Sequence, residues 1–134
     1  MEKKNNWNVS YSSILFFEQA LIGHKKVHSF ERTEDIYFTI QKDDFSIIKV
    51  VLVDRYTLGI ADIYRAIEEF HNFDYIVTCG EWNGYTPEAK QWGLENQKGV
   101  FIPSEFFAAL YKKDFWNYAK KDKDGKPIYC YRIT

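Results

Sequence analysis

Apolar residues recur at intervals of three or four in four stretches of the chain, which is the spacing of one face of a helix. The first stretch follows Ser12 and Ser13, either of which can cap a helix, and it ends at Gly23. The third follows Thr86, a cap that precedes a proline and a glutamate. The four helices are expected to begin near residues 12, 60, 87 and 104.

The segments between these helices favour strands, because they are rich in β-branched and aromatic residues. The run 36–40 alternates in side-chain character, whereas 46–53 is almost continuously apolar, as in a central strand covered on both faces. The strand 46–53 and the strand 74–79 should be parallel, because a helix joins them in a β-α-β unit. Further strands are expected at 27–30 and 99–102.

The resulting order is α-β-β-β-α-β-α-β-α, which predicts an α/β fold with a mixed central sheet and helices on both faces. Asp124-Gly125 is a turn signal between 115–119 and the alternating run 128–133, so the chain is expected to end in a C-terminal β-hairpin. A length of 134 residues suits one domain. The expected parts are a single domain over 1–134, its core at 12–111 and the hairpin segment at 112–134.

The composition is that of a folded protein, and its charge is unevenly distributed. Hydrophobic residues make up 46% and aromatic residues 19%, which excludes intrinsic disorder for most of the chain. The net charge of −1 argues against a protein whose main task is non-specific binding of a polyanion. However, the segment from Tyr111 onward carries +4 and residues 1–110 carry −5. A nucleic-acid function would therefore have to rest on a local basic patch.

The apolar runs and the cysteines indicate the expected cellular location of the protein. No run approaches the roughly 18 apolar residues of a membrane helix, and the first residues contain no signal-like apolar core. Cys79 and Cys130 lack a CxxC pattern and are expected to be ordinary reduced thiols, Cys79 being an inert thiol in the core. The sequence thus predicts a soluble, cytoplasmic protein without a membrane partner.

Short motifs follow one another in a fixed order through the predicted core. They are Asp35, Leu52-Val-Asp54-Arg55-Tyr56, the helix from Gly59, Ile76-Val-Thr78, Tyr85-Thr-Pro-Glu-Ala89, and Gly99-Val-Phe-Ile followed by Glu105–Leu110. In this order and at these spacings they resemble the restriction-endonuclease-like core of the PD-(D/E)xK superfamily, in particular its Mrr-type branch, over 12–111. The resemblance implies a Mg²⁺-dependent nuclease site made of carboxylates and a lysine.

The sequence departs from the family pattern at the catalytic motif itself. When Arg55-Tyr56 is aligned with the family's Arg-Tyr, Leu52 stands where the family has Gln or Glu, and Asp54 stands where it has Lys. A leucine offers no metal ligand, and an aspartate reverses the charge where a phosphate would approach. The nuclease motif is therefore predicted to be catalytically degenerate.

A shifted register would provide a rearranged nuclease site. Asp35 and Asp54 would then be the catalytic carboxylates and Mg²⁺ ligands, and Lys49 the catalytic lysine. Glu31 and Glu34 are further sources of oxygen ligands. The alternation of side chains along a strand places Lys49 on the opposite face from Asp54, unless a bulge intervenes.

Two other features are candidates for binding. The segment 112–134 interleaves lysines with aromatic residues, which is the composition of a surface for single-stranded nucleic acid, with Lys112, Lys113, Lys120, Lys121 and Trp116 as its candidate residues. The same composition suits a hairpin whose aromatic side completes the core and whose lysines protect an exposed strand edge. Trp82 follows a predicted strand in a glycine-flanked loop and is either a partner-binding residue or a lid on the core.

These features lead to three hypotheses of function. The first is an accessory protein associated with DNA or RNA, with a nuclease-like but catalytically degenerate fold. The second is a Mg²⁺-dependent nuclease with a rearranged site. The third is a protein-binding module of inhibitor or immunity type, for which a near-neutral charge and exposed aromatic residues are well suited.

Overall fold

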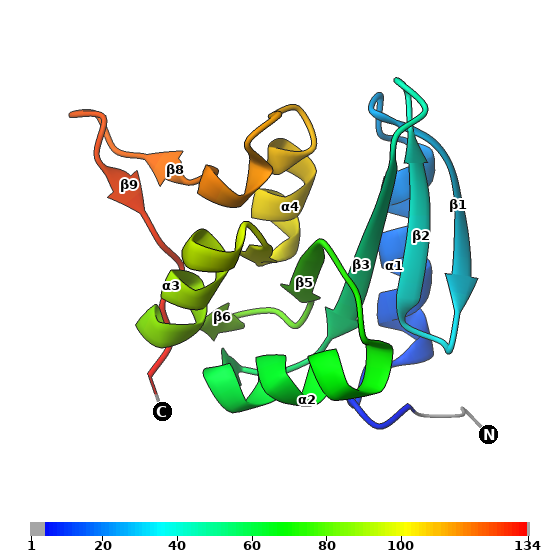
Figure 1. The fold of residues 1–134 in the computed structure, drawn as a ribbon, viewed down its shortest axis with the longest axis horizontal. Helices are drawn as coiled ribbons and strands as arrows, with labels where there is room; N and C mark the ends of the chain where they lie inside the picture. The colour runs from blue at the N-terminus through cyan, green and yellow to red at the C-terminus, as the bar shows by residue number, and fades with distance from the viewer. Residues whose placement is uncertain (1–4, 134) are drawn as a thin grey trace.

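The predicted helices and core strands form in the expected order around one mixed sheet (Figure 1). The structure is a computed structural model that describes residues 5–133, so the ends of the expected domain, 1–4 and 134, lie outside the described residues. The helices are α1 (Tyr11–Ile22), α2 (Ile60–Phe70), α3 (Pro87–Asn96) and α4 (Pro103–Ala109). The strands of the main sheet are β1 (Val27–Thr33), β2 (Tyr37–Lys42), β3 (Ile47–Val53), β5 (Tyr75–Thr78) and β7 (Gly99–Phe101).

The main sheet has the strand order β1-β2-β3-β5-β7 and changes character at β3. β2 pairs antiparallel with both β1 and β3, whereas β3–β5 and β5–β7 are parallel. Short turns join the antiparallel strands, and helices join the parallel ones, as the lengths of the connections require. The four residues of β3 from Val50 to Val53 are all buried, which confirms the prediction of a central strand.

Helices cover both faces of the sheet, as two neighbouring residues of β2 show. The ring of Phe38 contacts Phe17 of α1 with centroids 5.1 Å apart, and Phe17 also contacts Phe106 of α4 at 5.5 Å. The ring of Tyr37 stacks on Phe70 of α2 at 5.5 Å. Adjacent residues of a strand point to opposite faces, so α1 and α4 cover one face and α2 covers the other.

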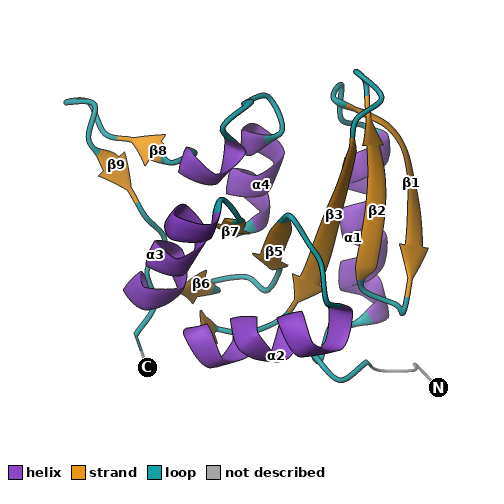
Figure 2. Cartoon of the chain, viewed as in Figure 1, coloured by secondary structure: helices purple, strands orange, loops and turns teal. Residues whose placement is uncertain are grey.

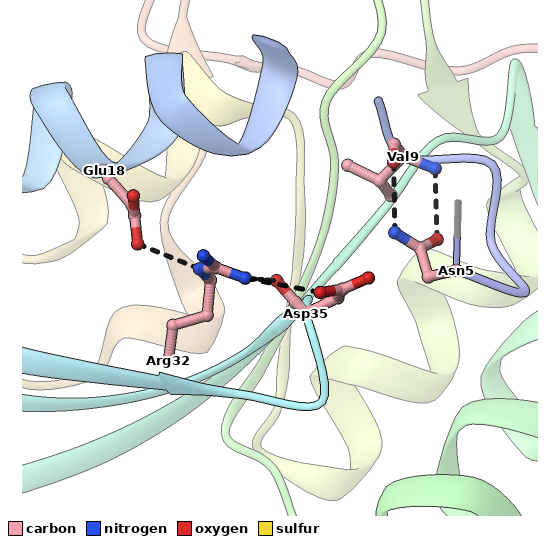
Figure 3. Close-up of polar contacts among 5 residues, drawn as sticks. All are labelled: Asn5, Val9, Glu18, Arg32 and Asp35. Atoms are coloured by element: carbon pink, nitrogen blue, oxygen red, sulfur yellow. Dashed lines mark hydrogen bonds and ion pairs between the residues drawn. The ribbon is translucent and has the colours of Figure 1, made fainter. Parts of the chain in front are cut away.

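The chain joins the core earlier than residue 12. Trp7 is 1% exposed, and its indole Nε1 donates to Glu69 Oε1 at 3.1 Å. The side chain of Asn5 holds the turn that follows, because it accepts from the Val9 amide and donates to the Val9 carbonyl (Figure 3). Ser10, and not Ser12 or Ser13, caps α1 by accepting from the Ser13 amide at 3.1 Å. The prediction of the cap was wrong because three serines stand close together.

The C-terminal hairpin forms, but with other strands than the sequence suggests. β8 (Lys120–Lys121) pairs with β9 (Pro127–Ile128) in a separate sheet, and Phe115–Asn117 is a 3₁₀ helix, so a strand at 115–119 was wrong (Figure 2). The ring of Phe115 contacts Tyr75 with centroids 4.4 Å apart. Aromatic residues of this segment therefore complete the core, as one alternative expected, whereas the hairpin does not extend the main sheet.

A small third sheet was missed by the sequence analysis. β4 (Thr57–Leu58) pairs in parallel with β6 (Gly84–Tyr85), and Tyr131 forms a parallel bridge to Tyr85 on the other side. Strands of two residues leave no periodicity in a sequence, so only the fold reveals them. Across the part of the chain that the structure describes, no helix has the length and apolar character that a membrane crossing needs.

Candidate functional site

The two ends of the main sheet carry different chemistry, and the candidate residues divide between them. β1, β3, β5 and β7 run in one direction, so the β1–β2 turn with Asp35 and the residue after β3, Asp54, lie at their carboxyl ends. Ile48 and Tyr75 lie at the amino ends of β3 and β5 and line the same groove as Lys112. β3 separates the two ends by about 20 Å, because each strand residue advances about 3.3 Å.

Asp35 is bound to an arginine at the carboxyl end (Figure 3). Arg32 Nη1 donates to the Asp35 carbonyl at 3.1 Å and pairs with Asp35 Oδ1 at 3.5 Å. Arg32 Nε pairs with Glu18 Oε2 of α1 at 2.9 Å. The arginine thus ties the β1–β2 turn to α1, and Asp35 serves as one of its two counter-ions.

Asp54 belongs to a hydrogen-bonded network that closes the ends of β3 and β5. Asn83 Nδ2 donates to Asp54 Oδ1 at 2.7 Å and to Thr78 Oγ1 at 3.0 Å. Thr78 Oγ1 also accepts from the Arg55 amide and donates to the Arg55 carbonyl. A Cβ at Gly80 would come within 2.5 Å of Asp54 Oδ1, so the network leaves no room for a side chain there.

Lys49 is not brought to these carboxylates. It pairs with Thr39 within the sheet, and its amide donates to Asp74 Oδ2 at 2.8 Å. It stands five residues before Asp54, a separation of about 16 Å along the strand, and it points to the opposite face. The structure therefore brings Asp35 and Asp54 to one end of the sheet and leaves Lys49 apart from them.

The residues at the carboxyl end do not fit the Mg²⁺ ion that the family resemblance implies. Asp35 already faces a guanidinium, whose positive charge opposes a dication, and Asp54 Oδ1 already accepts from Asn83. Among residues 5–133, no three His, Cys, Asp or Glu side chains gather in a group that could hold a metal. The arrangement stabilises the turns at this end of the sheet through hydrogen bonds and ion pairs.

Cys79 and Trp82 follow β5 at the same end and differ in accessibility. Burial, together with the nearby Asp54 carboxylate, raises the pKa of the Cys79 thiol to about 12, which keeps the thiol protonated and unreactive. Trp82 is 73% exposed, so its indole does not cover the core. Trp82 occupies the third position of the turn Gly80–Asn83 and has a φ of 70°. A positive φ at this position favours glycine or asparagine. Arg132 Nε fixes the turn by donating to the Trp82 carbonyl at 2.7 Å.

The amino end of the sheet contains a groove of about 530 Å³ lined by lysines, which we call the lysine groove. Lys26 and Lys42 come from the β-meander, and Lys112 and Lys113 from the loop after α4. An adjoining groove of about 550 Å³ shares the two lysines of this loop and continues to Tyr118 and Lys121. The aromatic side chains Tyr75, Tyr111 and Phe115 also line the lysine groove.

The structure places the predicted basic residues in different surroundings. Lys112, Lys113 and Lys121 line the two grooves, whereas Lys120 Nζ donates to Ser104 Oγ at 3.0 Å. Trp116 is half-buried and packs edge-on against Phe115, with centroids 5.1 Å apart. Lys26 and Lys42 were missed by the sequence analysis. They lie some 70 residues or more before Lys112 in the sequence, so no local pattern connects them with it.

Acidic residues balance part of the charge of the lysine groove. Lys26 Nζ pairs with Asp43 Oδ2 at 3.4 Å. Hydrogen bonds from the hydroxyl and the amide of Ser46 lower the pKa of Asp44, which therefore stabilises the β2–β3 turn as a carboxylate. Lys42, Lys112 and Lys113 have no carboxylate within ion-pair distance among the described residues. The ammonium groups of Lys112 and Lys113 are therefore available to an anionic ligand, whereas the charge of Lys42 also helps to lower the pKa of Asp44.

Comparison of the chain with protein-family models, with curated proteins and with solved structures found no match. The observed fold is α/β, with a mixed five-stranded sheet and four helices among the described residues. The resemblance to restriction endonucleases thus rests on the motifs of the sequence. The function has to be argued from the grooves, the charges and the hydrogen-bond networks of this molecule.

Proposed function

We propose that this chain is a nucleic-acid-binding accessory protein, and that it holds nucleic acid in the lysine groove at the amino end of the sheet. The observation that carries the proposal is the convergence of Lys26, Lys42, Lys112 and Lys113 on one groove from segments far apart in the sequence. Lysines that neutralise phosphates supply most of the non-specific affinity of a protein for nucleic acid. The groove is thus a local basic patch on a protein whose net charge is −1.

The aromatic side chains of the groove favour a single strand as the ligand. Tyr111 is 53% exposed, and Lys26 Nζ lies 5.7 Å from the centroid of its ring. An exposed ring beside an ammonium offers stacking to a base and a positive charge to the adjacent phosphate, which is the combination found in single-strand binding sites. Both DNA and RNA present these groups.

The separation of the lysine groove from Asp35 and Asp54 favours binding without cleavage. The phosphates held in the lysine groove would lie about 20 Å from the two carboxylates, across the length of β3. Both carboxylates are already engaged, Asp35 with Arg32 and Asp54 with Asn83. This supports an accessory protein and gives less support to a nuclease.

The proposal is tested by titrating a labelled single strand of about 12 nucleotides, as DNA and as RNA, and following fluorescence anisotropy at several salt concentrations. The double variant Lys112→Ala, Lys113→Ala should bind more weakly, and the salt slope should fall by about 0.7 for each phosphate that is no longer neutralised. The matched control Lys123→Ala, Lys126→Ala removes the same charge from the exposed hairpin turn and should keep the wild-type affinity within about twofold.

Three results would contradict the proposal. They are an absence of binding at low salt, an equal loss of affinity in the groove and control variants, and metal-dependent cleavage of the strand. Cleavage with Mg²⁺ or Mn²⁺ that disappears in Asp35→Ala would show a nuclease with a rearranged site instead.

A further inference from the structure

A groove of about 540 Å³ between α2 and α3 differs in charge from the lysine groove, and we call it the acidic groove. Its residues include Ile60 and Tyr64 of α2, Glu88, Trp92 and Glu95 of α3, and Tyr131 of the C-terminal segment. No lysine or arginine of the described chain lines it. It shares no lining residue with the lysine groove and was not expected from the sequence.

Apolar and aromatic side chains form the body of the acidic groove. The side chains of Tyr64 and Tyr131 are 57% and 39% exposed, so both rings are accessible. Trp92 is half-buried, and its ring lies 6.4 Å from that of Phe73, which anchors it to the core. Accessible aromatic rings beside an anchored one are typical of surfaces that bind another protein.

Two carboxylates stand along the α3 side of this groove. Glu88 and Glu95 are seven residues apart, which is two helical turns or about 10 Å along one face. Neither side chain forms an ion pair or hydrogen bond with any other residue that the structure describes, whereas Glu18 and Asp62 are paired with arginines. The groove therefore presents two free negative charges at a fixed spacing beside an aromatic surface.

We propose that the acidic groove binds a basic segment of a protein partner, with two cationic side chains about 10 Å apart on either side of an apolar one. The cations would pair with Glu88 and Glu95, and their aliphatic stems and the apolar side chain would pack on Trp92 and Ile60. The ring of Tyr64 can face a cation directly. The spacing matches two turns of a helix or about three residues of an extended chain.

Charge complementarity favours a basic protein segment in the acidic groove over a nucleic acid or over an acidic or purely apolar segment. A nucleic acid would bring its phosphates against two carboxylates, so the acidic groove repels the ligand that the lysine groove attracts. An acidic or purely apolar segment would leave the carboxylates without partners. The inference is independent of the proposed nucleic-acid function, because the two grooves are lined by different residues.

The test uses the full chain labelled with ¹⁵N and a synthetic amphipathic peptide that carries two lysines seven residues apart, with leucines between them. On titration, the indole N–H resonance of Trp92 and the amide resonances of α2 and α3 should shift. A matched peptide with glutamates in place of the lysines should cause no shift.

Paired variants separate the acidic groove from general charge attraction. Glu88→Gln, Glu95→Gln should weaken peptide binding about tenfold. The control Glu31→Gln, Glu34→Gln removes the same charge from exposed positions of β1 and the turn after it, and should leave binding unchanged. Tyr64→Ala, at an exposed position, should weaken binding without loss of folding.

Several results would overturn the proposal. They are equal weakening in the two glutamine pairs, shifts confined to other parts of the molecule, or binding of the glutamate peptide. Self-association detected by light scattering without peptide, and abolished by Glu88→Gln, Glu95→Gln, would show that a second copy of the chain occupies the groove instead.

Discussion

The ammonium group of Lys90 lies among aromatic rings at the free edge of the sheet. Its side chain is 2% exposed, and Nζ donates to the Val100 carbonyl at 2.5 Å. The rings of Tyr85 and Phe101 lie 4.5 Å from Nζ. β7 is the last strand of the sheet, and Lys90 supplies a donor that no further strand provides. Burial lowers the pKa of Lys90 to about 8, and the charge of Glu105 partly opposes this shift.

The pKa of Lys90 leads to a prediction for stability against pH. Between about pH 8 and 10.5 the unfolded chain binds more protons at this residue than the folded chain, so folding stability rises with pH in that window. The difference in unfolding free energy between wild type and Lys90→Met should increase by about 2 kcal/mol from pH 8 to pH 10. Urea unfolding at both pH values measures it.

The variant Lys90→Met is the reference because it keeps every tyrosine, so that tyrosine ionisation cancels in the comparison. A difference that stays constant across the window would show that Lys90 titrates with its ordinary pKa and is not buried as the structure has it.

Residues 130–132 of the C-terminal segment run alongside β6 and are hydrogen-bonded to it, and we call them the strap. The Tyr85 amide donates to the Cys130 carbonyl at 3.1 Å, and the Arg132 amide donates to the Tyr85 carbonyl at 2.9 Å. The Tyr85 hydroxyl accepts from the Cys130 amide and donates to Glu105 Oε2 at 2.8 Å. These bonds hold the strap against β6, and Gly84 allows the close approach of the two backbones.

Substitution of Gly84 should loosen this strap. In Gly84→Ala, the new Cβ would overlap the Cys130 carbonyl and lie 2.6 Å from Arg132 Cγ. We expect a loss of about 1–3 kcal/mol in unfolding free energy and faster hydrogen exchange at the Arg132 amide. Gly23→Ala is the control, because a Cβ there meets its nearest atom at 3.7 Å. An Arg132 amide that exchanges equally slowly in Gly84→Ala would contradict this account of the strap.

The molecule as a whole places its groove lysines and its groove glutamates apart, although Asp43 and Asp44 also line the lysine groove. The lysine groove lies at the amino ends of the parallel strands, and the acidic groove lies between α2 and α3. The engaged carboxylates Asp35 and Asp54 lie at the carboxyl ends. A near-neutral protein can therefore attract an anion and a cation at two sites.

This separation predicts that both proposed ligands bind at the same time. Saturation with the single strand should change the affinity for the basic peptide by less than about twofold, because the two sites share no residue. Titration of the labelled peptide with and without the oligonucleotide measures the effect at moderate salt. Mutual displacement of the two ligands from the protein would show that they compete for one site.

Much of the fold could be predicted because each large element leaves a local pattern. The apolar run of β3 and the cap and proline at the start of α3 were confirmed by the structure. The parallel pairing of β3 with β5 followed from the helix between them. One error lies where the local signal is ambiguous, as at Ser10, which stands close to two other serines. Another lies where tertiary packing decides the secondary structure, as at Phe115, which belongs to a 3₁₀ helix and packs its ring against Tyr75.

The candidate sites were less predictable than the fold. The basic composition of the segment 112–134 was enough to name Lys112, Lys113 and Lys121 as candidates. It could not predict that Lys26 and Lys42 lie in the same groove as Lys112 and Lys113. The burial of Lys90 also has no local signal, because a lysine on a helix is ordinarily exposed. The nuclease assignment of Asp35, Asp54 and Lys49 stays a prediction from the motifs.

The sequence by itself determined the α/β class, the order of the core elements and the excess of positive charge in the segment from Tyr111 onward. These follow from side-chain periodicity and composition, which act over a few residues. The tertiary structure alone decided which charges meet. It paired Glu18 of α1 with Arg32 of β1, buried Lys90 at the sheet edge and gathered distant lysines into one groove. The physical reason is that these contacts join segments distant in the chain, and their geometry exists only once the sheet and its helices have packed.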